Sequence, residues 1–279
     1  MAVPPTTDKK TRTFSMSIDI NATPDDVWRA LTEAGELMRW FPLQARVSPG
    51  KGGSMFWGWD DHWAWESEID AWEPGARLRL VERRPAFDVN GKPIDGPPQL
   101  LAMEFTIEVR EGKTTLRLVH SGFGDGANWD DELDSVSAGW QYELRGLRHY
   151  LEHHKGRDRR HASVHCVTSL ATNDVWRRLL APDAFAIVEG HLGQDARIAL
   201  RLPTNHRIAG RVEWYNPERD LFLVVDDLND GVFRLCTWRA GGRTGLQIWM
   251  VAYDDRYAAR VQEFGAMARQ LVDRLLPKN

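Results

Sequence analysis

The first 120 residues contain several runs in which apolar and polar side chains alternate, which is the pattern of β-strands that bury one face. In the run at residues 14–21, Phe14, Met16, Ile18 and Ile20 fall on one side. Later runs place further side chains on a shared face, namely Met55, Trp57 and Trp59; Trp63, Trp65, Ser67 and Ile69; Leu78 and Leu80; Leu101, Met103, Phe105, Ile107 and Val109; Leu116, Leu118 and His120. The pattern therefore predicts an antiparallel sheet with one buried face.

Three helices are predicted around these strands. Thr23 is placed to cap a helix that begins at Pro24, where the missing N–H of proline costs nothing. A second short helix ends at Pro42. The third helix is long, because residues 128–156 carry an apolar residue every three or four positions, acidic residues near the start, and His, Lys and Gly at the end. Its apolar stripe consists of Leu133, Val136, Trp140, Leu144, Leu147 and Leu151.

The order of these elements predicts an α+β fold in which a curved antiparallel sheet wraps around the long C-terminal helix. A single helix does not fill the concave face of such a sheet, so we expect a cavity between the two. Residues 85–98 contain four prolines and two glycines and are predicted to form a long loop.

The second half of the chain repeats the first. Residues 22–31, ATPDDVWRAL, reappear at residues 171–179 as ATNDVWRRL, and each copy follows a predicted strand. Farther on, Trp72, Pro74, Leu78 and Leu80 match Trp214, Pro217, Leu221 and Leu223, and a helical stripe from Val261 to Leu275 closes the second copy. This is a tandem duplication. We expect a disordered segment at 1–10, a first domain at 11–156, and a smaller, diverged second domain at 161–279 whose cavity is smaller or filled.

The composition is that of a globular protein, with 42% hydrophobic residues. No apolar run is long enough to span a bilayer, and the first fourteen residues lack the apolar core of a signal peptide, so a cytoplasmic location is expected. The two cysteines, Cys166 and Cys236, lie far apart and indicate neither a disulfide framework nor a zinc site.

Charge does not favour nucleic acid as a partner. The chain has 36 basic and 40 acidic residues, a net charge of −4, with −7 in residues 1–155 and +3 in residues 156–279. Neither half is basic enough to predict binding to a phosphate backbone.

Several motifs of the first copy resemble one known superfamily. These are ATPDDVWRALTEAGELMRWF at residues 22–41, the pair Gly52 and Gly53, LRLVHSGF at residues 116–123, and Trp129 with the pair at 139–140 in the closing helix. The first copy resembles the START-like (SRPBCC, helix-grip) superfamily, and within it bacterial relatives of the C-terminal domain of the Hsp90 ATPase activator. The resemblance covers most of residues 11–155 and implies a helix-grip fold. It does not imply one function, because lipid carriers, hormone receptors, polyketide cyclases and co-chaperones share the scaffold.

The tryptophans between residues 57 and 65 are either core or the lining of a ligand pocket. Aromatic residues at alternating strand positions are usually core. However, four inward-facing indoles need acceptors for their N–H groups, and a ligand cavity supplies them. Trp72 is expected on the opposite face. The residues predicted to line the site are Trp57, Trp59, Trp63, Trp65, Met103, Phe105, His120 and Trp140.

The leading hypothesis is that the first domain binds a small hydrophobic or aromatic molecule as a carrier or sensor. No metal or cofactor is predicted, because Asp60, Asp61 and His62 are adjacent and their side chains diverge, as do those of the His153–His154 pair. His120 has no nucleophile beside it, since Ser121 points to the other face of its strand. A buried histidine is more often structural than catalytic.

Three alternatives remain open. A polyketide cyclase-like or other small-molecule enzyme is favoured if Arg and His side chains lie inside the cavity, whereas an entirely apolar lining favours a carrier. A co-chaperone acting on Hsp90 is a minor alternative. The activators of that family carry an NxNNWHW-type motif in an N-terminal domain, and nothing like it occurs in the fourteen residues before the first predicted strand. The third alternative is a protein-interaction scaffold built from the tandem.

Overall fold

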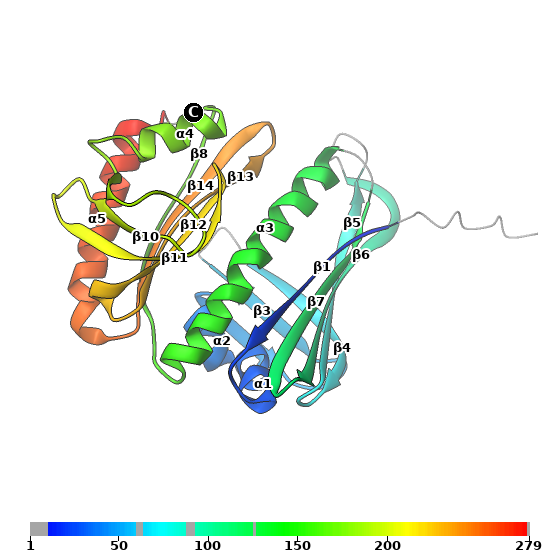
Figure 1. Cartoon of the computed structure of the whole chain (residues 1–279). Helices are drawn as coiled ribbons and strands as arrows, with labels where there is room; N and C mark the ends of the chain where they lie inside the picture. Colours follow the sequence, from blue (N-terminus) through cyan, green and yellow to red (C-terminus); the bar gives the residue numbers. More distant parts are fainter. Residues whose placement is uncertain (1–10, 60–63, 88–92, 125–126, 278–279) are drawn as a thin grey trace, which may run out of the picture. The chain divides into compact units, whose positions relative to one another are not determined.

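The computed structural model describes residues 11–59, 64–87, 93–124 and 127–277. The segment predicted to be disordered, 1–10, and Trp63 lie outside these ranges. The chain divides into two compact units, residues 1–155 and residues 156–279. Each unit contains a seven-stranded antiparallel sheet and a long helix that follows the last strand (Figure 1), so the predicted α+β fold is confirmed for both.

The first sheet has the strand order β1-β7-β6-β5-β4-β3-β2. Consecutive strands from β2 to β7 are neighbours, and the first strand joins the last one. At the turn between β6 and β7, Glu111 and Gly112 both have positive φ, as a tight hairpin requires. The strands are β1 (Arg12–Ile20), β2 (Gln44–Ser48), β3 (Ser54–Gly58), β4 (Ala64–Glu73), β5 (Arg77–Phe87), β6 (Pro93–Arg110) and β7 (Lys113–Phe123).

Two short helices, α1 (Pro24–Thr32) and α2 (Ala34–Trp40), connect β1 to β2. The predicted N-terminus of α1 is confirmed, because the Thr23 hydroxyl accepts the backbone N–H of Asp26 at 3.1 Å and Pro24 occupies the first turn. The long helix α3 (Ala127–His149) continues into a π-helical turn, η1 (Tyr150–His154).

The second unit repeats this topology with the order β8-β14-β13-β12-β11-β10-β9. Only one helix, α4 (Thr172–Leu179), follows its first strand, and α5 (Ala258–Leu275) is its long helix. Its strands are β8 (Arg160–Thr168), β9 (Ala186–Glu189), β10 (Arg197–Arg201), β11 (Arg207–Asn216), β12 (Asp220–Val225), β13 (Gly231–Ala240) and β14 (Arg243–Ala252), and its 3-10 turns are η2 (Asp226–Leu228) and η3 (Asp255–Tyr257).

The prediction of a long loop over residues 85–98 is wrong for residues 85–87 and 93–98, and residues 88–92 lie outside the described ranges. Strands β5 and β6 extend into this segment, and Phe87 pairs with Pro93. The ladder is irregular between Arg84 and Ala86, so Pro85 falls where a backbone N–H is not needed for pairing. Strand β5 tolerates Pro85 because this residue lies at the irregularity.

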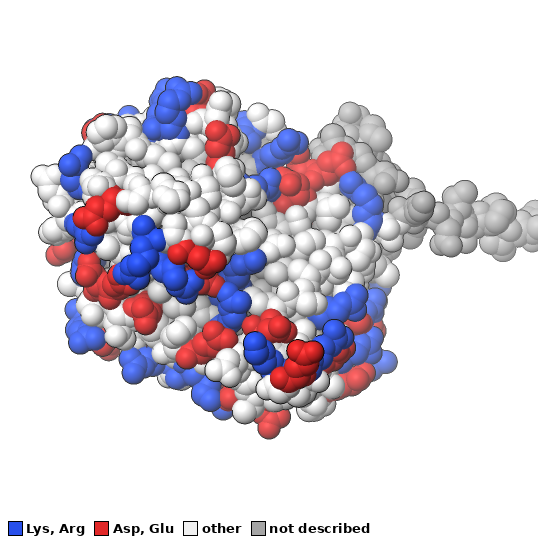
Figure 2. Space-filling view, viewed as in Figure 1, with Lys and Arg blue, Asp and Glu red and all other residues white. Residues whose placement is uncertain are grey.

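None of the helices in the described part of the chain combines the length and apolar composition that crossing a bilayer requires. On the face shown in Figure 2, basic and acidic side chains are interspersed, and uncharged surface separates them.

Candidate ligand-binding site

The inner face of the first sheet is the face on which α3 lies. Residues directly opposite each other on neighbouring strands share a face, so the register traces this surface from strand to strand. One row runs from Phe14 through His120, Met103 and Leu80 to Ile69. All of its members except Phe14 are buried. Met103 and His120 therefore lie side by side on the inner face, where the sequence predicted them.

An aromatic cluster fills one side of this face. Its centre is Phe41, which ends α2 and contacts Trp57 and Trp59 edge-on at 5.1 and 4.9 Å between ring centroids. Phe41 also packs against Trp40 and Trp140, both at 5.1 Å. The structure thus brings residues from α2, β3 and α3 together around a side chain that was not among the predicted site residues.

The predicted tryptophans join this cluster in different ways. Trp57 is 2% exposed and lies directly opposite Trp65, whereas Trp59 and Trp65 are half-buried and stack on each other at 4.8 Å. Phe105 is buried and meets Trp140 edge-on at 5.5 Å. The half-buried stack is the accessible margin of the cluster.

The expectation that Trp72 faces away from the inner side is wrong. The β4–β5 register shifts between Ile69 and Ala71, so Trp72 pairs with Leu78, and Ile69 pairs with Leu80. Leu78 and Leu80 share the inner face and are each 1% exposed. A β-bulge of this kind reverses the facing of every residue that follows it.

Three polar atoms on the inner face are buried and have no hydrogen-bond partner among the described residues. They are Trp57 Nε1, Ser67 Oγ and His120 Nδ1. Ser67 lies opposite Met55, and both are buried. Such atoms are rare in folded proteins, and each one calls for a ligand, a water molecule or another explanation. The alternation of β4 predicted the inward position of Ser67, but the sequence did not identify it as a site residue.

His120 is neutral at physiological pH. Burial, with a smaller contribution from the nearby charge of Arg84, lowers the pKa of His120 to about 4. Its ring packs against Phe123 at 4.8 Å. A neutral imidazole offers one donor and one acceptor, and with this pKa it is a weak base at pH 7.

An ion triad lies at the N-terminal end of α3. Arg84 donates from Nε and Nη2 to Glu82 at 2.7 and 3.1 Å, and from Nη1 to Glu132 of α3. Glu82 pairs with Leu101, which is buried, so Glu82 and Arg84 continue the inner face of β5. Burial opposes the charge of Arg84, but its bonds and attraction to Glu82 and Glu132 outweigh that effect and raise the pKa of Arg84. The alternation from Leu78 and Leu80 onward was the sequence signal for this triad.

Helix α3 is packed unevenly along its length. Every residue from 131 to 139 is half-buried, including Leu133 and Val136 of the predicted apolar stripe. In contrast, Trp140, Leu144 and Leu147 are buried. Helix α3 is therefore packed less tightly beside the ion triad than in its C-terminal half.

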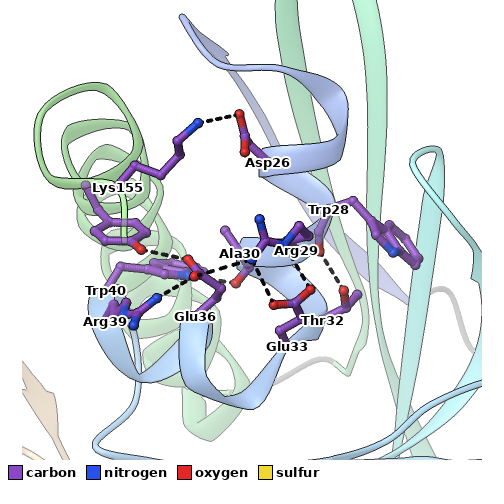
Figure 3. A network of polar contacts seen from close by, with 11 residues as sticks. Asp26, Trp28, Arg29, Ala30, Thr32, Glu33, Glu36, Arg39, Trp40 and Lys155 are labelled. Atoms are coloured by element: carbon purple, nitrogen blue, oxygen red, sulfur yellow. Dashed lines mark hydrogen bonds and ion pairs between the residues drawn. The ribbon is translucent and has the colours of Figure 1, made fainter. Parts of the chain in front are cut away.

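A polar network joins the other end of α3 to α1 and α2 (Figure 3). The Tyr150 hydroxyl donates to Glu36 Oε2 at 2.6 Å, and Arg39 donates to the other oxygen of the same buried carboxylate at 2.5 Å. Trp40 Nε1 donates to the backbone oxygen of Ala30 at 2.9 Å (Figure 3). These groups satisfy one another, so we assign this end a structural role.

A second contact of this network involves Lys155 and Asp26, whose charged atoms are 2.9 Å apart (Figure 3). The hydrogen bond from Lys155 lowers the pKa of Asp26, with a smaller contribution from Thr23, while burial acts against both.

The second unit has no comparable site among its described residues. Its inner face and helices form an apolar core that includes Leu221, Phe233 and Phe264. Trp176 Nε1 donates to the Thr237 hydroxyl at 3.0 Å, so the indole of this copy is satisfied within the protein. Among described residues, no buried side-chain polar atom of this unit lacks a partner.

Fold and site together define an α+β protein of the helix-grip type, with the sheet-and-helix unit present twice. Residues 21–152 match the family model of "Activator of Hsp90 ATPase homolog 1-like protein". This match confirms the resemblance of the first domain to that family. No curated protein matches the sequence.

Solved structures with a similar fold cover either about half or nearly all of this chain. The Aha1 dimer from Colwellia psychrerythraea is 19% identical, with 52% of this chain and 99% of that chain covered and a TM-score of 0.41. Protein MLL2253 from Mesorhizobium loti is 21% identical, with 52% and 99% covered and a TM-score of 0.44. The di-domain ARO/CYC BexL from the BE-7585A biosynthetic pathway is 17% identical, with 95% and 93% covered and a TM-score of 0.41.

Proposed function

We propose that the first domain binds a small hydrophobic or aromatic molecule between its sheet and α3, as a carrier or sensor. The observation that carries this proposal is the group of three buried polar atoms without a hydrogen-bond partner among the described residues on the inner face, at Trp57, Ser67 and His120. Trp59, Trp65, Met103, Phe105 and Trp140 are the other described residues of the proposed lining, and Trp63 belongs to the same prediction.

Energetics support a ligand over a purely structural role. Leaving a buried donor or acceptor unpaired costs about 1–3 kcal/mol. A ligand that covers apolar surface and supplies polar partners removes this cost, and the folded domain gains stability from binding. In the second unit the indole of Trp176, the counterpart of Trp28, is paired with the Thr237 hydroxyl, so a tryptophan of this fold can be satisfied within the protein.

The half-buried part of α3 supports a route to the inner face. Leu133 and Val136 belong to the apolar stripe and yet remain partly accessible. Apolar side chains in this position favour uptake of an apolar molecule beside the ion triad.

A small-molecule enzyme of the polyketide cyclase-like kind is the second candidate. The observation that favours it is the presence of Arg84, Glu132 and His120 on the same side of the sheet. Against it stands the pKa of His120, about 4, which makes this imidazole a poor general base at neutral pH. We therefore place binding first.

Native mass spectrometry of the purified full chain, compared with the denatured sample, tests the proposal. A small-molecule adduct that is lost on denaturation supports it, and the mass gives the ligand class. Recovery of the compound unchanged after incubation with the protein favours a carrier or sensor, whereas a product of different mass favours the enzyme. If no adduct appears and a panel of aromatic compounds leaves tryptophan fluorescence unchanged, the tryptophans are core and the proposal is wrong.

A further inference from the structure

We infer that the ligand is a neutral molecule that presents a hydrogen-bond acceptor oxygen to Trp57 and Ser67, and that the ion triad at the end of α3 disfavours anions. This inference rests on the proposed function and specifies the chemistry of the ligand. It rests on two observations: which of the buried atoms can donate a hydrogen bond, and which charges lie around Arg84.

Trp57 and Ser67 form a single polar spot. Trp57 lies opposite Trp65 and Met55 lies opposite Ser67, so Trp57 and Ser67 are diagonal neighbours on one face of β3 and β4. Diagonal neighbours have Cα atoms about 7–8 Å apart, within reach of one bound group between their side chains. Both residues are 2% exposed.

The chemistry of the spot requires an acceptor. An indole N–H only donates, and a serine hydroxyl both donates and accepts. A carbonyl or ether oxygen satisfies both donors at once because it has two lone pairs. A hydrocarbon satisfies neither, and a ligand amine competes with the indole as a second donor.

The Trp59–Trp65 stack lies beside this spot and gives a means of access. Both indoles are half-buried, and Trp65 packs against Trp57 with ring centroids 6.1 Å apart. Displacing a half-buried side chain costs less apolar burial than displacing a core residue. An aromatic ligand replaces the lost ring contacts with its own.

The ion triad disfavours a ligand carboxylate. Arg84 is bonded to Glu82 and Glu132, so one positive charge faces two negative charges. The net charge of the triad is −1, and it lies where α3 is half-buried. An anion that approaches there meets like charge instead of a free guanidinium.

Equilibrium dialysis of the full chain against three naphthalenes of similar shape tests the inference. These are 2-acetylnaphthalene, which has a neutral acceptor; 2-ethylnaphthalene, which has none; and 2-naphthoate, which is anionic at pH 7. We expect 2-acetylnaphthalene to bind about tenfold more tightly than 2-ethylnaphthalene, and 2-naphthoate to bind most weakly.

Variants separate the contributions. Ser67→Ala and Trp57→Phe should each reduce the preference for 2-acetylnaphthalene over 2-ethylnaphthalene, whereas Ser48→Ala, at an exposed position of β2, should not. Glu132→Gln should improve binding of 2-naphthoate several-fold. Glu108→Gln also removes one negative charge, but Glu108 alternates with the inward Ile107 on β6, so it should have no such effect.

The results of the dialysis experiment distinguish failure of the proposed function from failure of this inference. If none of the three compounds binds, the proposed function is wrong and this inference falls with it. If 2-acetylnaphthalene and 2-ethylnaphthalene bind equally well, the proposed function stands, the buried donors are satisfied by water or left unpaired, and the inference is wrong. Tighter binding of 2-naphthoate than of 2-acetylnaphthalene also overturns it.

Discussion

Trp72 on β4 packs edge-on against Trp28 on α1, with ring centroids 5.1 Å apart and the ring planes at 78°. This contact fixes α1 against the end of the sheet that is remote from the ion triad. It makes Trp72 a packing residue, although it shares the inner face with the candidate site.

Substituting Trp72 and Trp65 should therefore have opposite principal effects. Trp72→Ala removes the contact with Trp28 and should lower the free energy of unfolding by about 3 kcal/mol, measured by urea denaturation. Trp65→Ala removes half of an accessible stack and should lower stability less, but it should weaken binding of 2-acetylnaphthalene more. Equal losses of affinity in the two variants would place the ligand near α1 instead.

Stability should fall on mild acidification because of His120. The pKa of this residue is lowered from 6.5 to about 4 in the folded protein, so the unfolded chain binds more protons between these values. Its contribution is fully present above pH 6.5 and is lost as the pH falls towards 4, by about 3 kcal/mol in total. His120→Leu should flatten the dependence of the unfolding free energy on pH across this range. If the unfolding free energy of the variant depends on pH as steeply as that of the unmodified protein, His120 is not the group responsible.

The charge of Arg84 should be detectable at His120. Because Arg84 contributes to the low pKa of His120, Arg84→Met should raise that pKa towards its ordinary value, measured by NMR titration of the imidazole. Arg83→Met is the matched control, since Arg83 is the adjacent residue and pairs with Glu68. A pKa shift of the same size in both variants would show that net charge, not position, sets the effect.

Tyr150 should stabilise the junction between α2 and the end of α3. Tyr150→Phe removes the donor to the buried carboxylate of Glu36 and should lower the free energy of unfolding by about 1–3 kcal/mol. Tyr257→Phe deletes the same hydroxyl at a half-buried position of the second unit and serves as the control. Thermal unfolding of the two variants makes the comparison, and equal melting temperatures would refute the role of the Tyr150 hydroxyl.

Two glycines should respond to alanine in opposite directions. Gly122 has a φ of 100°, and a Cβ added there would lie 2.0 Å from the backbone oxygen of Leu100. Gly122→Ala should therefore destabilise the protein by about 2–4 kcal/mol. Gly35 lies in the first turn of α2 with no atom within 4 Å of an added Cβ, so Gly35→Ala should stabilise by about 0.5 kcal/mol. Destabilisation by Gly35→Ala would contradict this reading of the helix.

The parts of the fold that depend on local chemistry could be predicted from the sequence. The alternation in β1 and β7, the Thr23 cap and the stripe of α3 all follow from periodicity and terminus signals. The direction in which Trp72 faces could not be predicted in this way, because the bulge after Ile69 arises from the pairing of two strands and not from the sequence of either one.

The same bulge corrects the alignment of the two halves. In the second sheet the register shifts between Val212 and Trp214, and Tyr215 pairs with Leu221. Tyr215 packs on the core of its unit, so it is the structural counterpart of Trp72. The sequence comparison instead matches Trp72 with Trp214, because both residues are tryptophan.

The candidate site was predicted only in outline. Met103, Phe105 and His120 lie on the expected face, but the central position of Phe41 depends on how α2 packs against α3, which no local pattern encodes. The triad of Glu82, Arg84 and Glu132 was missed because charged residues at strand positions suggest solvent exposure. Alternation alone would have placed Glu82 and Arg84 inward.

The pairing of β1 with β7 constrains how the first unit is made. Arg12 pairs with Phe123, so the first strand leaves the ribosome about 100 residues before its only partner in the sheet. At typical rates of synthesis, of the order of 5–20 residues per second, β1 waits several seconds with its edge open. Contacts of such long sequence separation form slowly, and an unpaired apolar strand is prone to aggregation in that interval. The hairpins from β2 to β7 can form as they emerge, so closure by β1 is expected to be the final step in folding of this sheet.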